Sequence, residues 1–254
     1  MSHAQSQLRT AKKAYSLAAR QIDLTAKSSG LTDRISQQLI GTGVAADWTL
    51  RAAHLERLEY STEGLNKPAR QRTITELVRF TFSWYAVNAI FARDELLSAI
   101  AVAGGETATS WASELERFRV LHRLAASPAE PTYRARIEHV LRTSRRQRTP
   151  ITATQSPASI LGAVHLRYVP SSERRKRLAR VLETAAATGN YSAIDMPILI
   201  YMIRNWSVHG NTLDGAFEGK LNYLQVVESC QDALADIHVS TSTLLLRLAS
   251  TGGL

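Results

Sequence analysis

The chain has 254 residues, 44% hydrophobic and 21% charged, so it is long and apolar enough to form a packed core, and its composition argues against general disorder. Its 31 Lys and Arg residues outnumber 22 Asp and Glu residues, and the net charge of +9 is typical of either a polyanion-binding protein or a merely basic surface. A single cysteine, Cys230, excludes an intramolecular disulfide and a cysteine-ligated zinc site.

The first 60 residues favour helices. Apolar residues recur at helical intervals over residues 4–28, and Ser28-Ser29-Gly30 ends that pattern. Shorter helical patterns cover residues 31–39 and 44–60. Because glycine lowers helix propensity, we expect Gly41-Thr42-Gly43 to separate these two helices.

The best candidate for a domain boundary is Pro68, since the residue before a proline is biased away from helix. We therefore expect a helical N-terminal extension over residues 1–67 and a main helical domain over residues 68–254. Scattered basic residues near the N-terminus argue against a signal peptide. The sequence has no run of about 18 apolar residues, so no membrane span is expected. We expect a cytoplasmic protein without membrane contact.

The middle of the chain predicts three more helices. One long helix is expected over residues 73–102, ended by Gly104-Gly105, and its many aromatic residues do not fit one stripe. That pattern indicates burial on more than one face, as in a central or dimer-forming helix. Two further helices are expected over residues 108–125 and 132–146, with prolines between them.

The last third of the chain also reads as helical. A helix is expected from about Ser171 to Gly189-Asn190. Asp195 precedes a densely apolar segment as an N-cap does, and that helix is expected to end near Val208. A final helix covers about residues 218–249. Because no repeat or strand pattern stands out, we predict an all-α fold.

Two arginine-rich runs, residues 142–150 and 174–180, are the strongest basic segments. Each is typical of a solvated helix face, and the two together could also guide a phosphate backbone. No aromatic residue interleaves them, so base stacking on these runs is not indicated. The candidate nucleic-acid contacts are Arg142, Arg145, Arg146, Arg148, Arg174, Arg175, Lys176 and Arg177.

A base, a cation and an amide occur together where the apolar helix ends. Asn205 and His209 are i,i+4 neighbours on one helix face, and the long side chain of Arg204 can reach the same space. These groups suit phosphodiester chemistry. A plainer interpretation is a common helix ending, with His209 favoured by the helix dipole and Gly210 at the C′ position.

The segment Arg204-Asn205-Trp206-Ser207-Val208-His209-Gly210 resembles the R-N-x-x-x-H-G signature of the HEPN family of all-helical, RNA-directed domains. The aromatic-rich residues 79–91, with Asn88 near their centre, are similar to that family's first helix. The resemblance covers roughly residues 70–250 and implies a helical bundle of HEPN type. The preceding 70 or so residues remain outside it.

The resemblance implies metal-independent cleavage of RNA. His209 would transfer protons to and from the ribose 2′-OH and the leaving 5′-oxygen, and Arg204 would neutralise the scissile phosphate. Asn205 would orient the phosphate or the imidazole. One histidine cannot conveniently perform both proton transfers, and the family's solution is a homodimer whose two protomers share one cleft. No metal or other cofactor is expected.

Three hypotheses follow. The first is a homodimeric HEPN-type endoribonuclease, a toxin or antiviral defence effector with RNA as its partner and a protein regulator or antitoxin. The second is a non-catalytic HEPN-like module that binds RNA or protein, and the third is a helical scaffold. The sequence has no P-loop, no G-x-G-x-x-G, no G-x-S-x-G and no H-x-x-x-H pair, so competing chemistries have little support.

Overall fold

The computed structural model confirms the all-α prediction, since every regular element in the part of the chain that it describes is a helix. The chain divides into two compact units, one formed by Met1–Pro131 with Gln231–Leu254 and the other by Thr132–Cys230. The boundary expected between residues 67 and 68 stays a prediction. The described residues are 2–58, 68–107, 111–142, 173–208 and 223–254.

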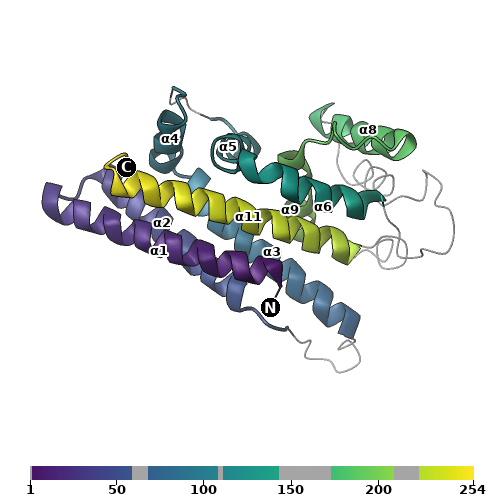
Figure 1. Cartoon of the computed structure of the whole chain (residues 1–254), viewed down its shortest axis with the longest axis horizontal. Coiled ribbons are helices and arrows are strands. Elements are labelled where there is room, and N and C mark those ends of the chain that lie inside the picture. The colour runs from purple at the N-terminus through teal and green to yellow at the C-terminus, as the bar shows by residue number, and fades with distance from the viewer. Residues whose placement is uncertain (1, 59–67, 108–110, 143–172, 209–222) are drawn as a thin grey trace. The chain divides into compact units, whose positions relative to one another are not determined.

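The first unit is built on long helices that lie side by side, among them α1 (His3–Ser29) and α2 (Asp33–His54) (Figure 1). These pack with α3 (Pro68–Phe91) and with the C-terminal part of α11 (Tyr223–Ser250). Small side chains let the helices approach closely, and Phe82 packs against a buried cluster that joins three of them. Members of that cluster are Ala4, Leu8, Ala52, Ala53 and Ala235.

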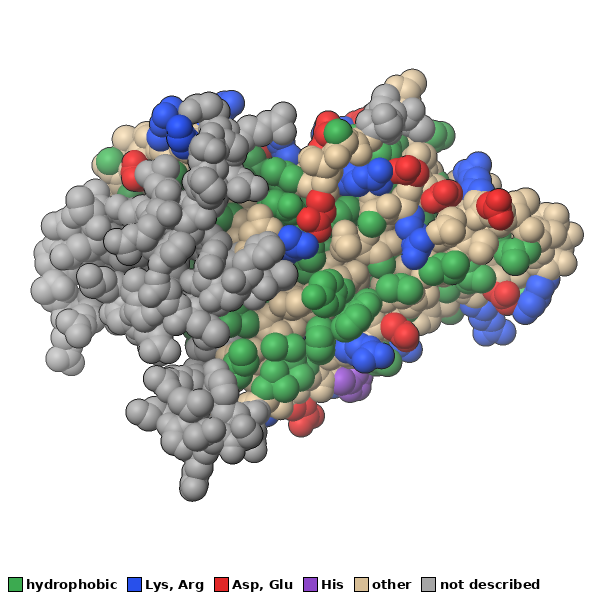
Figure 2. Space-filling model, turned by 180° about the vertical axis from the view of Figure 1, so that it is seen from behind, with side chains coloured by type: hydrophobic (Ala, Val, Ile, Leu, Met, Phe, Trp, Pro, Cys, Tyr) green, Lys and Arg blue, Asp and Glu red, His purple; other side chains and the backbone are tan. Residues whose placement is uncertain are grey.

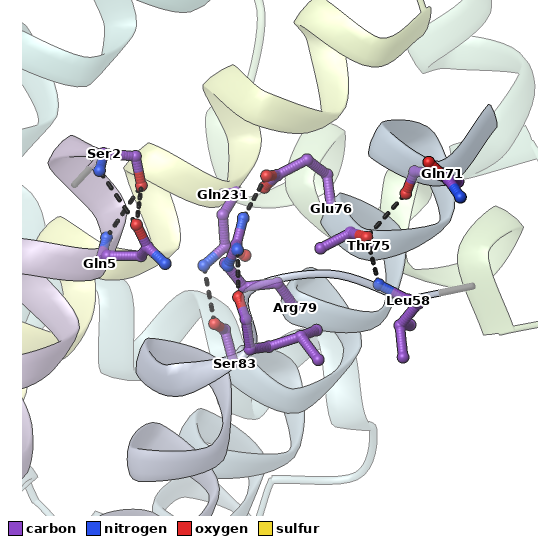
Figure 3. Close-up of polar contacts among 10 residues, drawn as sticks. Ser2, Gln5, Leu58, Gln71, Thr75, Glu76, Arg79, Ser83 and Gln231 are labelled. Carbon is purple, nitrogen blue, oxygen red and sulfur yellow. Dashed lines mark hydrogen bonds and ion pairs between the residues drawn. The ribbon is translucent and has the colours of Figure 1, made fainter. Parts of the chain in front are cut away.

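Polar side chains fix the ends of these helices (Figure 3). At the start of α1, the Ser2 hydroxyl accepts from the Gln5 backbone N–H at 3.3 Å, and the Gln5 side chain accepts from the Ser2 N–H at 3.1 Å. This reciprocal capping box satisfies two backbone donors that the helix itself cannot pair. The helix expected over residues 4–28 is confirmed.

A buried polar chain links α1, α3 and α11. The Tyr15 hydroxyl donates to Nδ1 of His238 at 3.1 Å, and Nε2–H of His238 donates to the Ser83 carbonyl at 2.8 Å. The amide of Gln231 donates to the Ser83 hydroxyl at 2.8 Å (Figure 3). Burial lowers the pKa of His238 to about 4, although its bond to the Ser83 carbonyl opposes the change, and burial raises the pKa of Tyr15.

The helix break expected at Gly41-Thr42-Gly43 does not occur, because α2 runs through it without interruption. A Cβ atom at position 41 would lie 2.5 Å from Cδ1 of Leu96 and 2.6 Å from Cδ of Arg93. Gly41 therefore allows α2 to approach its neighbours closely, and it does not act as a helix breaker.

The same helix ends at His54, short of the predicted end at residue 60. The buried Arg79 guanidinium forms an ion pair with Glu76 and donates to the Leu55 carbonyl, and the Leu58 N–H donates to the Thr75 hydroxyl at 3.0 Å (Figure 3). The Leu55 carbonyl and the Leu58 N–H thus bind side chains of α3 and not helical partners, and α2 ends at His54.

The single helix expected over residues 73–102 is two helices, α3 and α4 (Asp94–Ala103). Arg93 between them is extended, with φ −99° and ψ 119°. The Arg117 guanidinium donates to the Phe91 and Ala92 carbonyls at 3.2 and 3.4 Å, which satisfies acceptors at the end of α3. A distant arginine therefore stabilises this break.

Shorter helices follow in close succession, and the prolines do not separate them as widely as expected. After α5 (Glu114–Leu121) come a π-helical turn, η2 (His122–Ala126), a 3₁₀ turn, η3 (Ser127–Ala129), and α6 (Glu130–Arg142). Proline lies near the start of η3 and of α6, where its missing N–H costs no hydrogen bond.

The second unit contains most of α6, α8 (Glu173–Thr188), α9 (Met196–Val208) and the first turns of α11. The predicted bounds of the apolar helix over residues 196–208 are confirmed. Gly189 has φ +73° just beyond α8, as a helix C-terminus often requires. Within the described residues, no helix is long and apolar enough to cross a membrane.

Candidate functional site

The start of α9 is held by a cap and by an arginine. Oδ1 of Asp195 accepts from the Ile198 N–H at 3.1 Å, which confirms the predicted N-cap. The Arg134 guanidinium on α6 donates to the Ser192 and Ile194 carbonyls at 3.3 and 3.0 Å. Arg134 therefore connects α6 to the turn that leads into α9.

The two faces of α9 differ in chemistry. One face is almost fully buried and supplies the apolar anchor of the helix; its residues are Met196, Leu199, Ile200, Met202 and Ile203. The other face is half-buried and carries Ile198, Tyr201, Arg204 and Asn205. The polar residues of the motif therefore lie on a rigid helix and away from its most buried side.

Arg204 and Asn205 are joined directly. Nη1 of Arg204 donates to Oδ1 of Asn205 at 2.8 Å, and the guanidinium carbon lies 5.7 Å from the centre of the Tyr201 ring. A hydrogen bond and a ring contact restrict a side chain that otherwise has many rotamers. Because Oδ1 of Asn205 accepts from Arg204, its Nδ2 is the group that can donate to an anion.

The third member of the motif, His209, lies outside the described residues, as does Gly210. The side chains of Trp206, Ser207 and Val208 are likewise not described, although their backbone belongs to α9. The structure thus brings Arg204 and Asn205 together, and the i,i+4 relation of Asn205 to His209 stays a prediction.

Of the basic candidates, Arg142 has the best-defined surroundings. Its guanidinium lies 4.7 Å from the centre of the buried Tyr191 ring and 3.3 Å from Oε2 of Glu138, and its side chain is 52% exposed. On α8, Lys176 is half-buried and Arg177 is exposed. The remaining candidate side chains lie outside the described set: Arg145, Arg146, Arg148, Arg174 and Arg175.

The sequence reasoning missed three residues of this unit. Tyr201 lies three positions before Arg204 and so on the same helix face, a spacing that could have identified it. Arg134 and Tyr191 act across long sequence separations, and no local pattern marks them. The second stretch of the resemblance, residues 79–91, belongs to α3 in the first unit, where Asn88 lines a pocket.

Among the described residues, no three His, Cys, Asp or Glu side chains gather into a group that could hold a metal ion. Arginine and amide groups are the chemistry that α9 does present, and they suit a phosphate. A comparison of the chain with protein-family models, with curated proteins and with solved structures finds no match.

Proposed function

We propose that this protein is a metal-independent endoribonuclease of HEPN type. The observation that carries the proposal is the Arg204 guanidinium, which Asn205 and Tyr201 hold on the half-buried face of a capped, apolar helix. His209 follows four residues after Asn205, where a helical continuation would place it on the same face. An anchored cation beside a group that titrates near neutrality is what RNA transesterification needs.

The chemistry is an internal displacement at phosphorus. The 2′-oxygen attacks the phosphorus atom, the bond from phosphorus to the 5′-oxygen breaks, and the products are a 2′,3′-cyclic phosphate and a 5′-OH. One His209 takes the proton of the 2′-OH, and His209 of a second protomer gives a proton to the leaving oxygen. Arg204 neutralises the charge that develops on the phosphate, and Nδ2 of Asn205 donates to it.

RNA is the proposed substrate, and the basic residues of the chain would raise its local concentration. A ribonuclease of this kind suits a toxin or defence effector, which a protein regulator or antitoxin would hold in check. A non-catalytic module that binds RNA without cutting it is the competing proposal, and the same experiment separates the two.

The test is cleavage of labelled RNA by the purified protein in EDTA, with His209→Ala beside it. We expect the wild-type protein to cut in EDTA and to leave a 2′,3′-cyclic phosphate. His209→Ala should lower the rate by about 10²- to 10⁴-fold while RNA binding persists, because it removes a proton-transfer group. His54→Ala, which changes an exposed histidine on α2, is the matched control and should cut like the wild type.

Arg204→Ala separates phosphate binding from proton transfer. It should lower the cleavage rate by about 10²- to 10³-fold and also weaken RNA binding. The slope of the logarithm of the binding constant against the logarithm of the salt concentration should decrease in magnitude by about one. DNA, or RNA with a 2′-O-methyl group at the scissile position, should be bound and not cut. Cleavage that requires Mg²⁺, or full activity of His209→Ala, would overturn the assignment; binding without cleavage would favour the non-catalytic module.

A further inference from the structure

The first unit contains a pocket that the proposed cleavage site does not use. It lies between α2 and α3, is open to solvent and has a volume of about 420 Å³, within the range of roughly 300–1,000 Å³ typical of small-molecule sites. Its lining includes Val44, Trp48, Tyr85, Asn88 and Arg93. In Figure 1, α2 and α3 lie behind α1, and Figure 2 shows that side of the molecule, where hydrophobic side chains gather with both basic and acidic side chains around them.

Aromatic rings form one side of this α2/α3 pocket. The Trp48 ring lies 5.1 Å from the Tyr85 ring and 5.2 Å from the Phe82 ring, measured between centroids. Phe82 is partly buried and packs against the buried cluster of the unit, so it connects Trp48 to the core. Tyr85 is 36% exposed. The pair therefore presents a supported aromatic surface to solvent.

Arg93 is the charged residue among the described residues that line the pocket, and Arg51 lies near it. The Arg93 guanidinium donates to the Gln37 side chain. The absence of a Cβ atom at Gly41 makes room for the Arg93 side chain against α2. The guanidinium of Arg51 lies 5.1 Å from the centre of the Trp48 ring. Arg93 is therefore fixed at the pocket, and Arg51 is held against one of its rings.

The lining discriminates among ligand classes. None of the described lining residues is acidic, and the two arginines repel cations, so the rings are unsuited to a quaternary ammonium ligand. A planar ring can stack on the exposed Tyr85, the Asn88 amide can both donate to and accept from a base edge, and a guanidinium suits a phosphate.

We propose that the α2/α3 pocket binds a nucleobase together with its phosphate. Two sources share that chemistry: a free nucleotide, and an unpaired nucleotide of an RNA strand. The site is one of binding and not of cleavage, and it stands whether or not the protein cuts RNA.

The experiment uses the full chain and two probes, adenosine 5′-monophosphate by titration calorimetry and a fluorescent single-stranded 2′-O-methyl RNA of mixed sequence by polarisation. The modified strand cannot be cut through its 2′-oxygen, so the result is independent of the cleavage proposal. The variants are Tyr85→Ala, Tyr85→Phe and Arg93→Gln. Leu17→Ala on α1 removes an exposed apolar side chain outside the pocket and is the control, and circular dichroism checks that each variant folds.

Tyr85→Ala removes the ring on which a base would stack and should weaken binding about tenfold. Tyr85→Phe keeps the ring and should bind like the wild type. Arg93→Gln should weaken binding most at low salt. An effect on both probes identifies a nucleotide site, and an effect on the strand alone identifies an RNA contact. Unchanged binding of both probes by folded Tyr85→Ala, or an equal loss in Leu17→Ala, would overturn the proposal.

Discussion

At the scale of single residues, His238 couples folding to pH. Its imidazole is fully buried between Tyr15 and the Ser83 carbonyl, and both ring nitrogens are used by the neutral form. The pKa of His238 is about 4 in the folded chain, below its ordinary value of 6.5. The unfolded chain therefore binds a proton at a pH where the folded chain does not, and folding loses stability as the pH falls from 6.5 toward 4.

We expect that fall in pH to lower the free energy of unfolding by about 3 kcal/mol through His238 alone. The measurement is urea unfolding at a series of pH values. His238→Gln can still donate to the Ser83 carbonyl and accept from Tyr15, and it should show a shallower pH dependence, whatever its absolute stability. His54→Gln, at an exposed site, should keep the wild-type dependence. If the free energy of unfolding of the wild type and of His238→Gln changed equally with pH, this role of His238 would be contradicted.

At the scale of elements, the two glycines of α2 differ in the space around them. A Cβ at Gly41 would meet Leu96, Arg93 and, at 3.0 Å, the Ala89 carbonyl, whereas a Cβ at Gly43 meets nothing within 4 Å. Alanine favours a helix over glycine by about 1 kcal/mol at either position. Only at position 41 is this gain opposed by overpacking, which costs about 1–3 kcal/mol.

Gly43→Ala should therefore stabilise the protein by up to about 1 kcal/mol, and Gly41→Ala should destabilise it by up to about 2 kcal/mol. Thermal or urea unfolding of the two variants measures the difference directly, and each serves as the control for the other. A stabilising effect of Gly41→Ala would show that α2 does not need its close approach to α3 and α4.

At the scale of the whole molecule, the proposed shared site requires two protomers. A two-fold axis near α9 would pair its half-buried face, which carries Ile198 beside Tyr201 and Arg204, with the same face of a second chain. Each protomer would then supply one Arg204 and one His209 to the cleft.

We expect sedimentation velocity at micromolar concentration to give twice the protomer mass. Ile198→Lys should shift the protein to a monomer and abolish cleavage, because two-fold symmetry places each new charge near its own copy. Ala187→Lys, at an exposed position of α8, adds the same charge elsewhere and should stay dimeric and active. A wild-type monomer in the absence of RNA would count against the dimeric site.

The helices, and those helix ends that depend on local chemistry, could be predicted from the order of the residues alone. Periodic apolar residues predicted α1 and α9, and the Asp195 cap predicted where α9 begins, since capping involves residues only three apart. The adjacency of Arg204 and Asn205 at the end of a buried helix was predictable for the same reason, although the bond between their side chains was not.

How those helices continue, end and pack depends on contacts between residues that are distant in the chain. Gly41 lies inside α2 and allows Leu96 and Arg93 to approach it, and Arg117 donates to the Phe91 carbonyl where α3 ends. The α2/α3 pocket depends on the same kind of contact, since Trp48 and Tyr85 come together only when their helices pack. Such contacts join residues far apart in the chain, and local propensity and periodicity carry no information about them.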